Sequence, residues 1–456
     1  MNKGQLIGLI TAVSLILGNT IGSGIFTTSG FLVRDIGHPP LILSLWALGG
    51  AIVLCGSLAY TRLHRLWPES GGEFVYIHKG WGRAPAFLSG WTSLTLGFGA
   101  GIAAAAMGAS HYALTLLTDL VPNDSVLNQA FAPNLLAVLL IVGVTLPHSF
   151  SIRASTRSHL LITAVKVILI GGLFTAAFAV LGGADKSTAV QASFLTAPPE
   201  RPVDFAAVGL GLVFILYAYS GWNAVNYIAE EVRTPARTIR NAMLISVVLI
   251  TFFYLTANTL YFAALPYEQL VAEPILPVAK KAMDATLGTS FTTVFTLALC
   301  LALLTSVSAM VWVGPRVYSK MAESGLLPTA LISRTAGGSP ARAIYLQSLW
   351  AIALCLTGTF EQLIVYSGLA LMVFSSLAVA AALRFHPEGG DKVGWWGAVL
   401  YLLLVLPAVG LATVHQPKTA LLSLLTVLAG YPIYWMMDSR CPRLLRLRRI
   451  DSPTDR

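Results

Sequence analysis

Charged residues are scarce in this sequence. Only 11% of its 456 residues are Asp, Glu, Lys or Arg, whereas about 25% is usual for a soluble globular domain. In their place, 56% of the residues are hydrophobic and the mean hydropathy is +0.74. Soluble domains cannot bury that much apolar surface, so the composition argues against a cytosolic enzyme, a disordered chain and a nucleic-acid-binding module.

The patterns that mark metal sites and enzyme sites are also missing. The four cysteines are scattered, and the eight histidines form no His-x-x-x-His or Glu-x-x-His pair, which argues against a disulfide framework and a zinc site. No nucleophile elbow or P-loop is present. All 20 acidic residues fall in loops or at the ends of apolar runs, so none is expected deep in the membrane. We therefore predict no enzyme activity, no catalytic residue, no metal and no cofactor.

Long apolar runs fill most of the chain. Because a transmembrane helix needs about 20 apolar residues, we predict an all-α membrane protein with twelve spans. The predicted spans are Gln5–Val33, Pro40–Leu63, Ala84–Leu117, Pro133–His148, Ser158–Gly182, Phe205–Ile228, Ile239–Leu265, Val278–Met310 continuing to Tyr318, Ala341–Gly358, Glu361–Leu383, Val393–Val414 and Thr419–Met437. The third and eighth are longer than one crossing needs, and we expect each to tilt instead of splitting in two.

The basic residues predict the orientation. With twelve spans, 22 of the 29 Lys and Arg residues lie on the side of both termini, six lie on the opposite side, and Lys166 lies within a span. Cytoplasmic loops collect Lys and Arg, so we expect a multi-pass protein of the cell membrane with both termini in the cytoplasm. The basic segment 438–456 is then a cytoplasmic tail that anchors the topology.

Two spans are interrupted by glycine and small polar residues near their middle. They contain Gly18–Phe26 (GNTIGSGIF) and Tyr217–Asn226 (YAYSGWNAVN). Backbone groups left unpaired in lipid cost several kcal/mol each, so such breaks persist only where protein or a cavity covers them. Small-residue packing seams are the alternative interpretation, and we interpret Gly49-Gly50 and the Gly97, Gly99, Gly101 run as such seams.

The chemistry of a paired break is specific. Amides freed at the start of one half-helix attract a carboxylate, and carbonyls freed at the end of the other attract an ammonium. A zwitterionic amino acid carries both groups. Interrupted spans at matching positions of two halves indicate a transporter binding site, and spans one and six are five apart, as in two inverted five-helix repeats with two accessory helices.

Four motifs resemble those of the amino acid–polyamine–organocation (APC) superfamily of permeases, within it the L-type amino acid transporter-like branch. The motifs are Gly18–Phe26; Pro68–Tyr76 leading to Gly90-Trp91; Tyr219–Asn223 through Glu230–Pro235; and Gly314–Tyr318 followed by Met321–Pro328. The resemblance implies a LeuT-type fold: a first five-helix repeat over 1–183, an inverted second repeat over 203–384, and accessory spans over 393–437. It also implies secondary active transport of amino acids by alternating access.

The resemblance assigns site residues in this chain. The predicted substrate-binding residues are Asn19, Thr20, Ile21, Gly22, Ser23, Gly24, Tyr217, Ala218, Ser220, Gly221 and Asn223. Amides around residues 22–24, helped by the Ser23 hydroxyl, would hold the carboxylate, and the carbonyls of residues 20, 217 and 220 would hold the ammonium. Tyr217 occupies the place of an aromatic gate, and Asn223 would face the substrate side chain.

Lys166 lies about 12 Å into the fifth predicted span, at 1.5 Å per residue. An intramembrane charge indicates function by default, although a lysine near a span end can also snorkel to the interface. In the transporters that this sequence resembles, a lysine in helix five lies against the unwound first helix and replaces a coupling sodium ion. Lys166 could also carry a coupled proton, and uniport or amino acid exchange with a permanently charged Lys166 stays open.

The absence of a deep acidic residue favours neutral L-amino acids, because a cationic side chain is usually met by a buried carboxylate. Glu230 and Glu231, beside Arg233 and Arg237, are expected to form a solvated cytoplasmic network. A polyamine or cationic amino acid permease, and a non-transporting amino acid sensor or a channel on the same fold, are the alternatives. The expected partners are the amino acid and the lipid bilayer, without nucleic acid, and the sequence does not specify an accessory subunit.

Overall fold

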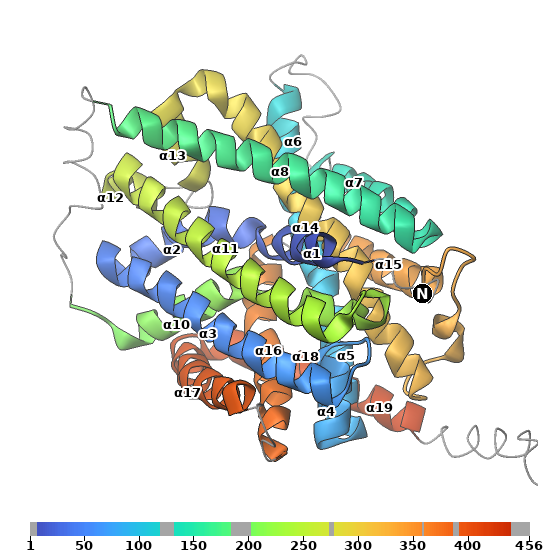
Figure 1. Cartoon of the computed structure of the whole chain (residues 1–456). Helices are drawn as coiled ribbons and strands as arrows, with labels where there is room; N and C mark the ends of the chain where they lie inside the picture. The colour runs from blue at the N-terminus through green and yellow to red at the C-terminus, as the bar shows by residue number, and fades with distance from the viewer. Residues whose placement is uncertain are drawn as a thin grey trace, which may run out of the picture.

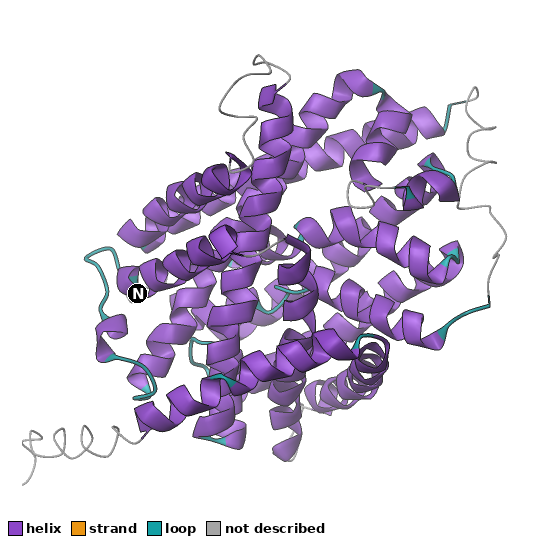
Figure 2. Ribbon diagram, turned by 180° about the vertical axis from the view of Figure 1, so that it is seen from behind, coloured by secondary structure: helices purple, strands orange, loops and turns teal. Residues whose placement is uncertain are grey.

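The computed structural model describes residues 7–118, 132–183, 202–272, 278–357, 360–385 and 392–438. These residues are almost entirely helical (Figure 2), and two isolated β-bridges, Ile7 with Val232 and Ser151 with Gly337, are the only extended pairings among them. The predicted all-α class is therefore confirmed. The predicted basic tail, apart from Asp438, lies outside the described residues.

The helices occur in the following order: α1 (Leu9–Thr20), α2 (Ser23–Ile36), α3 (Pro39–Leu66), α4 (Glu73–Trp81), α5 (Arg83–Thr92), η1 (Ser93–Ala100), α6 (Gly101–Thr118), α7 (Ala132–Phe150), α8 (Ile152–Leu181), α10 (Phe205–Ala218), η5 (Ala224–Glu231), α11 (Pro235–Ala264), α12 (Tyr267–Val271), α13 (Val278–Leu287), α14 (Thr289–Glu323), η6 (Thr329–Ile332), α15 (Ala341–Thr357), α16 (Phe360–Ala381), η7 (Ala382–Arg384), α17 (Lys392–His415), α18 (Pro417–Leu428) and α19 (Gly430–Asp438). The segment η1 is π-helical, and η5, η6 and η7 are 3₁₀-helical.

Several of the described helical stretches are long and apolar enough to cross a membrane. Among the described residues, nine candidate spans of 18 residues or more are present, together with three shorter apolar helices, which are α1, α10 and α15. Large apolar side chains also cover the outside of the bundle: Ile168, Phe252 and Leu403 are 71%, 70% and 64% exposed. Apolar groups on the outer surface suit a lipid surrounding.

Two span boundaries differ from the prediction, and one long span behaves as predicted. The eighth span starts at Thr289 and not at Val278, because Gly288 adopts a left-handed conformation (φ 81°) that ends α13 before α14 begins. The fifth span starts at Ile152 and not at Ser158, because the Ser151 hydroxyl caps α8 by accepting the Ala154 N–H. The third span is one continuous helix from Arg83 to Leu114 and does not split.

The interrupted helices lie in the interior of the bundle. Helix α1 packs against α8, α11 and α14, and α2 packs against α10. Figure 1 shows α1 near the middle of the molecule, between α8 and α11. Protein therefore surrounds the residues whose backbone leaves the helix.

Candidate functional site

The first break lies between α1 and α2. Helix α1 ends at Thr20, Ile21 has an extended ψ of 90°, and α2 begins at Ser23. A Cβ atom on Gly22 would lie 2.6 Å from the Ser306 hydroxyl oxygen on α14. Because that space is filled, only glycine lets the bare backbone lie this close to the neighbouring helix.

The second break follows α10. Helix α10 ends at Ala218, residues 219–223 form turns, and the chain continues as the 3₁₀-helix η5. Gly221 has φ 101°, which L side chains rarely adopt, and a Cβ on it would lie 2.5 Å from the Asn19 side-chain nitrogen. The glycine is therefore required both by the turn and by the contact with the first break.

The two breaks touch each other. A Cβ on Gly24 would lie 2.6 Å from the Ala218 Cα. The Tyr254 hydroxyl of α11 lies 2.8 Å from the Thr20 carbonyl oxygen and 2.7 Å from that of Ala218, so it ties the ends of α1 and α10 together. Sequence reasoning missed Tyr254, because a tyrosine in an apolar helix carries no motif.

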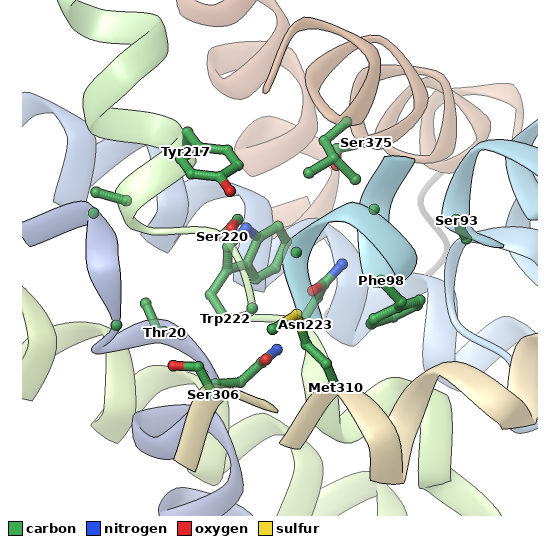
Figure 3. Close-up of a pocket in the computed structure, with 18 of the residues that line it drawn as sticks. Thr20, Ser93, Phe98, Tyr217, Ser220, Trp222, Asn223, Ser306, Met310 and Ser375 are labelled. Carbon is green, nitrogen blue, oxygen red and sulfur yellow. The ribbon is translucent and has the colours of Figure 1, made fainter. Parts of the chain in front are cut away.

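A cavity of about 120 Å³ opens beside the breaks (Figure 3). A single water needs about 10–15 Å³, so the cavity has room for a small molecule. Nine of the eleven predicted substrate-binding residues line it: Asn19, Thr20, Gly22, Gly24, Tyr217, Ala218, Ser220, Gly221 and Asn223. Ile21 and Ser23 are not among its lining residues, and the Ser23 side chain lies outside the described ones. Substrate binding by these residues stays a prediction.

Two of the three predicted ammonium-binding carbonyls, those of Thr20 and Tyr217, have partners within the protein. The Thr20 carbonyl is contacted by Tyr254, and the Tyr217 carbonyl accepts the Ser220 N–H at 2.9 Å. A carbonyl oxygen has two lone pairs, so each can still accept one hydrogen bond from a ligand.

The run Gly97, Gly99, Gly101 is more than the packing seam predicted for it. A Cβ on Gly99 would meet Trp350 at 2.5 Å, as a seam requires, but Gly97 and Gly101 line the cavity. Gly97 and Gly99 also lie in η1, and π-helical segments are frequent at functional sites. Gly49 and Gly50 do form a seam, facing Ile215 and Thr251.

Lys166 lies behind the first break and is fully buried. Its Nζ donates to the carbonyls of Leu17, Gly18 and Ile21 at 3.4, 3.3 and 3.0 Å. Residue 166 is 14 positions after Ile152 in a 30-residue helix, or about 21 Å at 1.5 Å per residue, deeper than predicted. The snorkelling interpretation is therefore wrong. The ammonium instead neutralises the negative end of the α1 dipole, and Lys166 does not line the cavity.

An acidic residue that sequence reasoning did not place at the site, Glu73, lines the cavity. Glu73 lies between two predicted spans, as expected. Helix α4, which begins at this residue, folds back against the bundle, so Glu73 lines the cavity and is only 3% exposed. Its Oε1 accepts hydrogen bonds from Tyr60 (2.8 Å), Asn223 (3.1 Å) and Ser375 (2.8 Å). Burial raises the pKa of the Glu73 carboxyl, and the three hydrogen bonds act in the opposite direction.

Glu231 also differs from its prediction. Its side chain is 7% exposed and pairs with the buried Arg316 of α14, whose Nε donates to Oε1 at 3.0 Å. Glu230 is 48% exposed and contacts Lys320. The predicted solvated network with Arg233 and Arg237 is wrong for Glu231, because η5 turns that side chain toward α14.

Two buried histidines join α7, α14 and α8. The Ser308 hydroxyl lies 2.9 Å from His148 Nε2 and 3.2 Å from His159 Nδ1. A Cβ on Gly18 would lie 2.5 Å from the His159 ring, so this imidazole packs directly against the end of α1. Across the described ranges, no three His, Cys, Asp or Glu side chains gather as they would for a metal ion.

The sequence model of the amino acid permease family matches residues 7–436. The chain belongs to this family. Similar proteins include the Asc-type amino acid transporter 1 of Mus musculus (26% identity, covering 94% of this chain and 80% of the relative) and the large neutral amino acids transporter small subunit 2 of Homo sapiens (26%, with the same coverage). The cystine/glutamate transporter of Homo sapiens is 25% identical, and the matched region covers 96% of this chain and 87% of that relative.

These relatives confirm the resemblance to the L-type branch of the APC superfamily. The family and the relatives are transporters and not enzymes. Together with the apolar helices, they identify this permease as a multi-pass membrane protein.

Proposed function

We propose that this permease is a secondary transporter of amino acids, acting as a permease or exchanger by alternating access. One observation carries the proposal: two helix breaks meet at one cavity. The amides at the start of α2 suit a carboxylate, and the carbonyl ends of α1 and α10 suit an ammonium. An α-amino acid carries both groups on one carbon, so it can engage both breaks at once.

The fold within this proposal has twelve spans, in two inverted five-helix repeats and two accessory helices, with both termini in the cytoplasm of a cell-membrane protein. Single cysteines introduced into successive loops should react with an impermeant thiol reagent from alternating sides. Labelling of residue 3 or 440 from outside intact cells would contradict the proposed orientation.

The proposed substrates are neutral L-amino acids. Support comes from the lining of the cavity, in which Glu73 is the one acidic residue and no Lys or Arg occurs among the described residues. One relative is named for large neutral amino acids. The same Glu73 favours a second candidate, a cationic amino acid or polyamine, because a buried carboxylate attracts a cation.

Lys166 is the proposed coupling site. Its ammonium occupies the position at the end of α1 where a cation would otherwise neutralise three carbonyls. With this built-in charge, transport can proceed without a sodium ion, as proton symport, exchange or uniport. No cofactor is part of the proposal.

The test is transport by the purified chain in liposomes. We expect saturable uptake or exchange of a labelled amino acid, measured with and without a proton gradient and with and without internal substrate. No flux of any of the twenty amino acids under these conditions would overturn the proposal, and stoichiometric binding without flux would identify a sensor. One relative is called a small subunit, and flux by the purified chain alone would show that transport needs no second subunit.

A further inference from the structure

Glu73 is a buried acid that receives hydrogen bonds from three other parts of the bundle. Tyr60 comes from α3, Asn223 from the turn before η5, and Ser375 from α16. All three donors reach the same oxygen, Oε1. Three donors on one oxygen stabilise the ionised form of the carboxylate and oppose the effect of burial, which raises its pKa.

The charge of Glu73 has no counterpart in the protein. In the part of the chain that the structure describes, no Lys, Arg or His nitrogen forms an ion pair with it. The other buried charge near the breaks, Lys166, is bound to carbonyls of α1 and does not line the cavity. An unpaired buried charge is costly, and here it faces a space that can hold a ligand.

A purely structural role explains only part of this arrangement. Glu73 is the first residue of α4, where an acidic side chain stabilises the helix dipole. An acidic residue in the first turn stabilises the helix dipole equally well when its side chain is exposed to solvent, as such side chains usually are. At Glu73 the side chain is instead buried, lines the cavity and contacts Asn223, the residue expected to face the substrate side chain.

We propose that Glu73 makes the cavity select substrates whose side chain donates a hydrogen bond, from a hydroxyl, thiol, amide or ammonium group, over aliphatic side chains of equal size. The inference rests on the proposed function. If the two breaks hold the substrate's carboxylate and ammonium, its side chain must enter the remaining space. Figure 3 shows Thr20 of the first break and Ser375 on opposite sides of the cavity in that view.

Asn223 adds a second hydrogen-bond acceptor beside the Glu73 carboxylate. One N–H of the Asn223 side-chain amide is engaged with Glu73, and its side-chain carbonyl oxygen is a further acceptor. A valine-like side chain would desolvate these acceptors without satisfying them, and buried acceptors left unpaired carry a penalty. A hydroxyl of the same size would satisfy one of them.

The test compares pairs of ligands of equal shape on the purified full-length permease. Threonine against valine gives a neutral donor, and 2,4-diaminobutyrate against norvaline gives a cationic donor. Dissociation constants come from thermal-shift titration, and competition against labelled substrate in liposomes gives an independent value. We expect the donor of at least one pair to bind about tenfold or more tightly, the effect of one hydrogen bond to a charged group.

Two variants and one control assign the preference to the carboxylate. Glu73→Gln keeps the shape but removes the charge, and should reduce the donor-to-aliphatic ratio at least fivefold. Glu73→Asp keeps the charge and should retain part of the preference. Glu69→Gln is the control, because Glu69 lies in the same loop, is 36% exposed and does not line the cavity.

Each outcome has a defined meaning. Equal affinity for both members of both pairs in the unmodified protein would overturn the inference, whatever the variants do. A Glu73→Gln protein that is less stable but keeps the wild-type ratio would assign Glu73 a structural role only, and would also overturn it. If no amino acid binds at all, the proposed function fails, which is distinct from amino acids binding without preference.

Discussion

Glycines in this chain differ in what an added methyl group would touch. At Gly24 the nearest atom is the Ala218 Cα, part of a backbone that cannot move aside cheaply. At Gly171, in the middle of α8, nothing lies within 4 Å. A substitution at Gly24 therefore tests the contact between the breaks, whereas the same substitution at Gly171 tests only the effect of replacing glycine within a helix.

Gly24→Ala should abolish transport, because the new Cβ would push α2 away from α10. We expect at least a tenfold loss of initial uptake rate with normal membrane insertion. Gly171→Ala is the control and should be neutral or slightly stabilising, since alanine favours a helix by about 0.5–1 kcal/mol. Normal uptake by Gly24→Ala would show that the contact between the breaks is dispensable.

Lys166→Met should also impair transport, because three carbonyls at the end of α1 would lose their cationic donor. Uptake in liposomes at several external pH values measures the effect. The control is Lys280→Met, which removes a 36% exposed lysine paired with Asp284. Unchanged kinetics of Lys166→Met at every pH would remove this lysine from the mechanism.

Sequence reasoning located the residues of the breaks because their signal is local. Glycine and small polar residues within an apolar run already indicate an interrupted helix, and nine of the eleven predicted residues line the cavity. Glu73 and Tyr254 escaped because their positions depend on tertiary packing. Nothing in a loop sequence shows that α4 turns back and buries its first residue.

At the scale of elements, Tyr254 holds the two interrupted helices in register. Its hydroxyl contacts carbonyl oxygens at the ends of α1 and α10. Tyr261 lies on the same helix and is equally buried, but its hydroxyl has no hydrogen-bond partner among the described residues. The helix thus offers its own control for the loss of a buried hydroxyl group.

Tyr254→Phe should lower the stability by about 1–3 kcal/mol, because it leaves buried carbonyl groups without their donor. It should also lower substrate affinity by loosening the breaks. Tyr261→Phe should be neutral or stabilising. Thermal unfolding in detergent and substrate titration measure both effects, and equal behaviour of the two variants would contradict the role given to Tyr254.

The element boundaries that the sequence missed depend on local capping. The start of α8 is set by the Ser151 hydroxyl, and the start of α14 by the left-handed Gly288. Both residues lie beside apolar runs whose hydropathy continues across the boundary. Hydropathy therefore predicts which segments are helical, whereas single polar or glycine residues decide where each helix begins.

At the scale of the whole molecule, one buried ion pair connects segments distant in the chain. Glu231 at the end of η5 pairs with Arg316 of α14, and the Glu231 carbonyl accepts the Ile7 N–H at 3.1 Å, which joins the segment before α1 to the same point. Arg316 also donates to the Trp312 carbonyl. The first interrupted helix, the second interrupted helix and α14 therefore converge on one pair of charges.

Glu231→Gln should destabilise the whole bundle, because it leaves the Arg316 guanidinium buried without a counter-charge. Loss of one partner of a buried pair costs about 3–5 kcal/mol. The control is Asp284→Asn, which breaks the surface pair with Lys280, where the side chains are 36% and 31% exposed and a cost of about 0–1 kcal/mol is expected. Thermal inactivation of ligand binding measures both variants. If the two variants lose stability equally, the Glu231–Arg316 pair does not hold the segments together. If only Glu231→Gln loses stability, this ion pair, which lies outside the cavity, helps to keep the two breaks in their relative position.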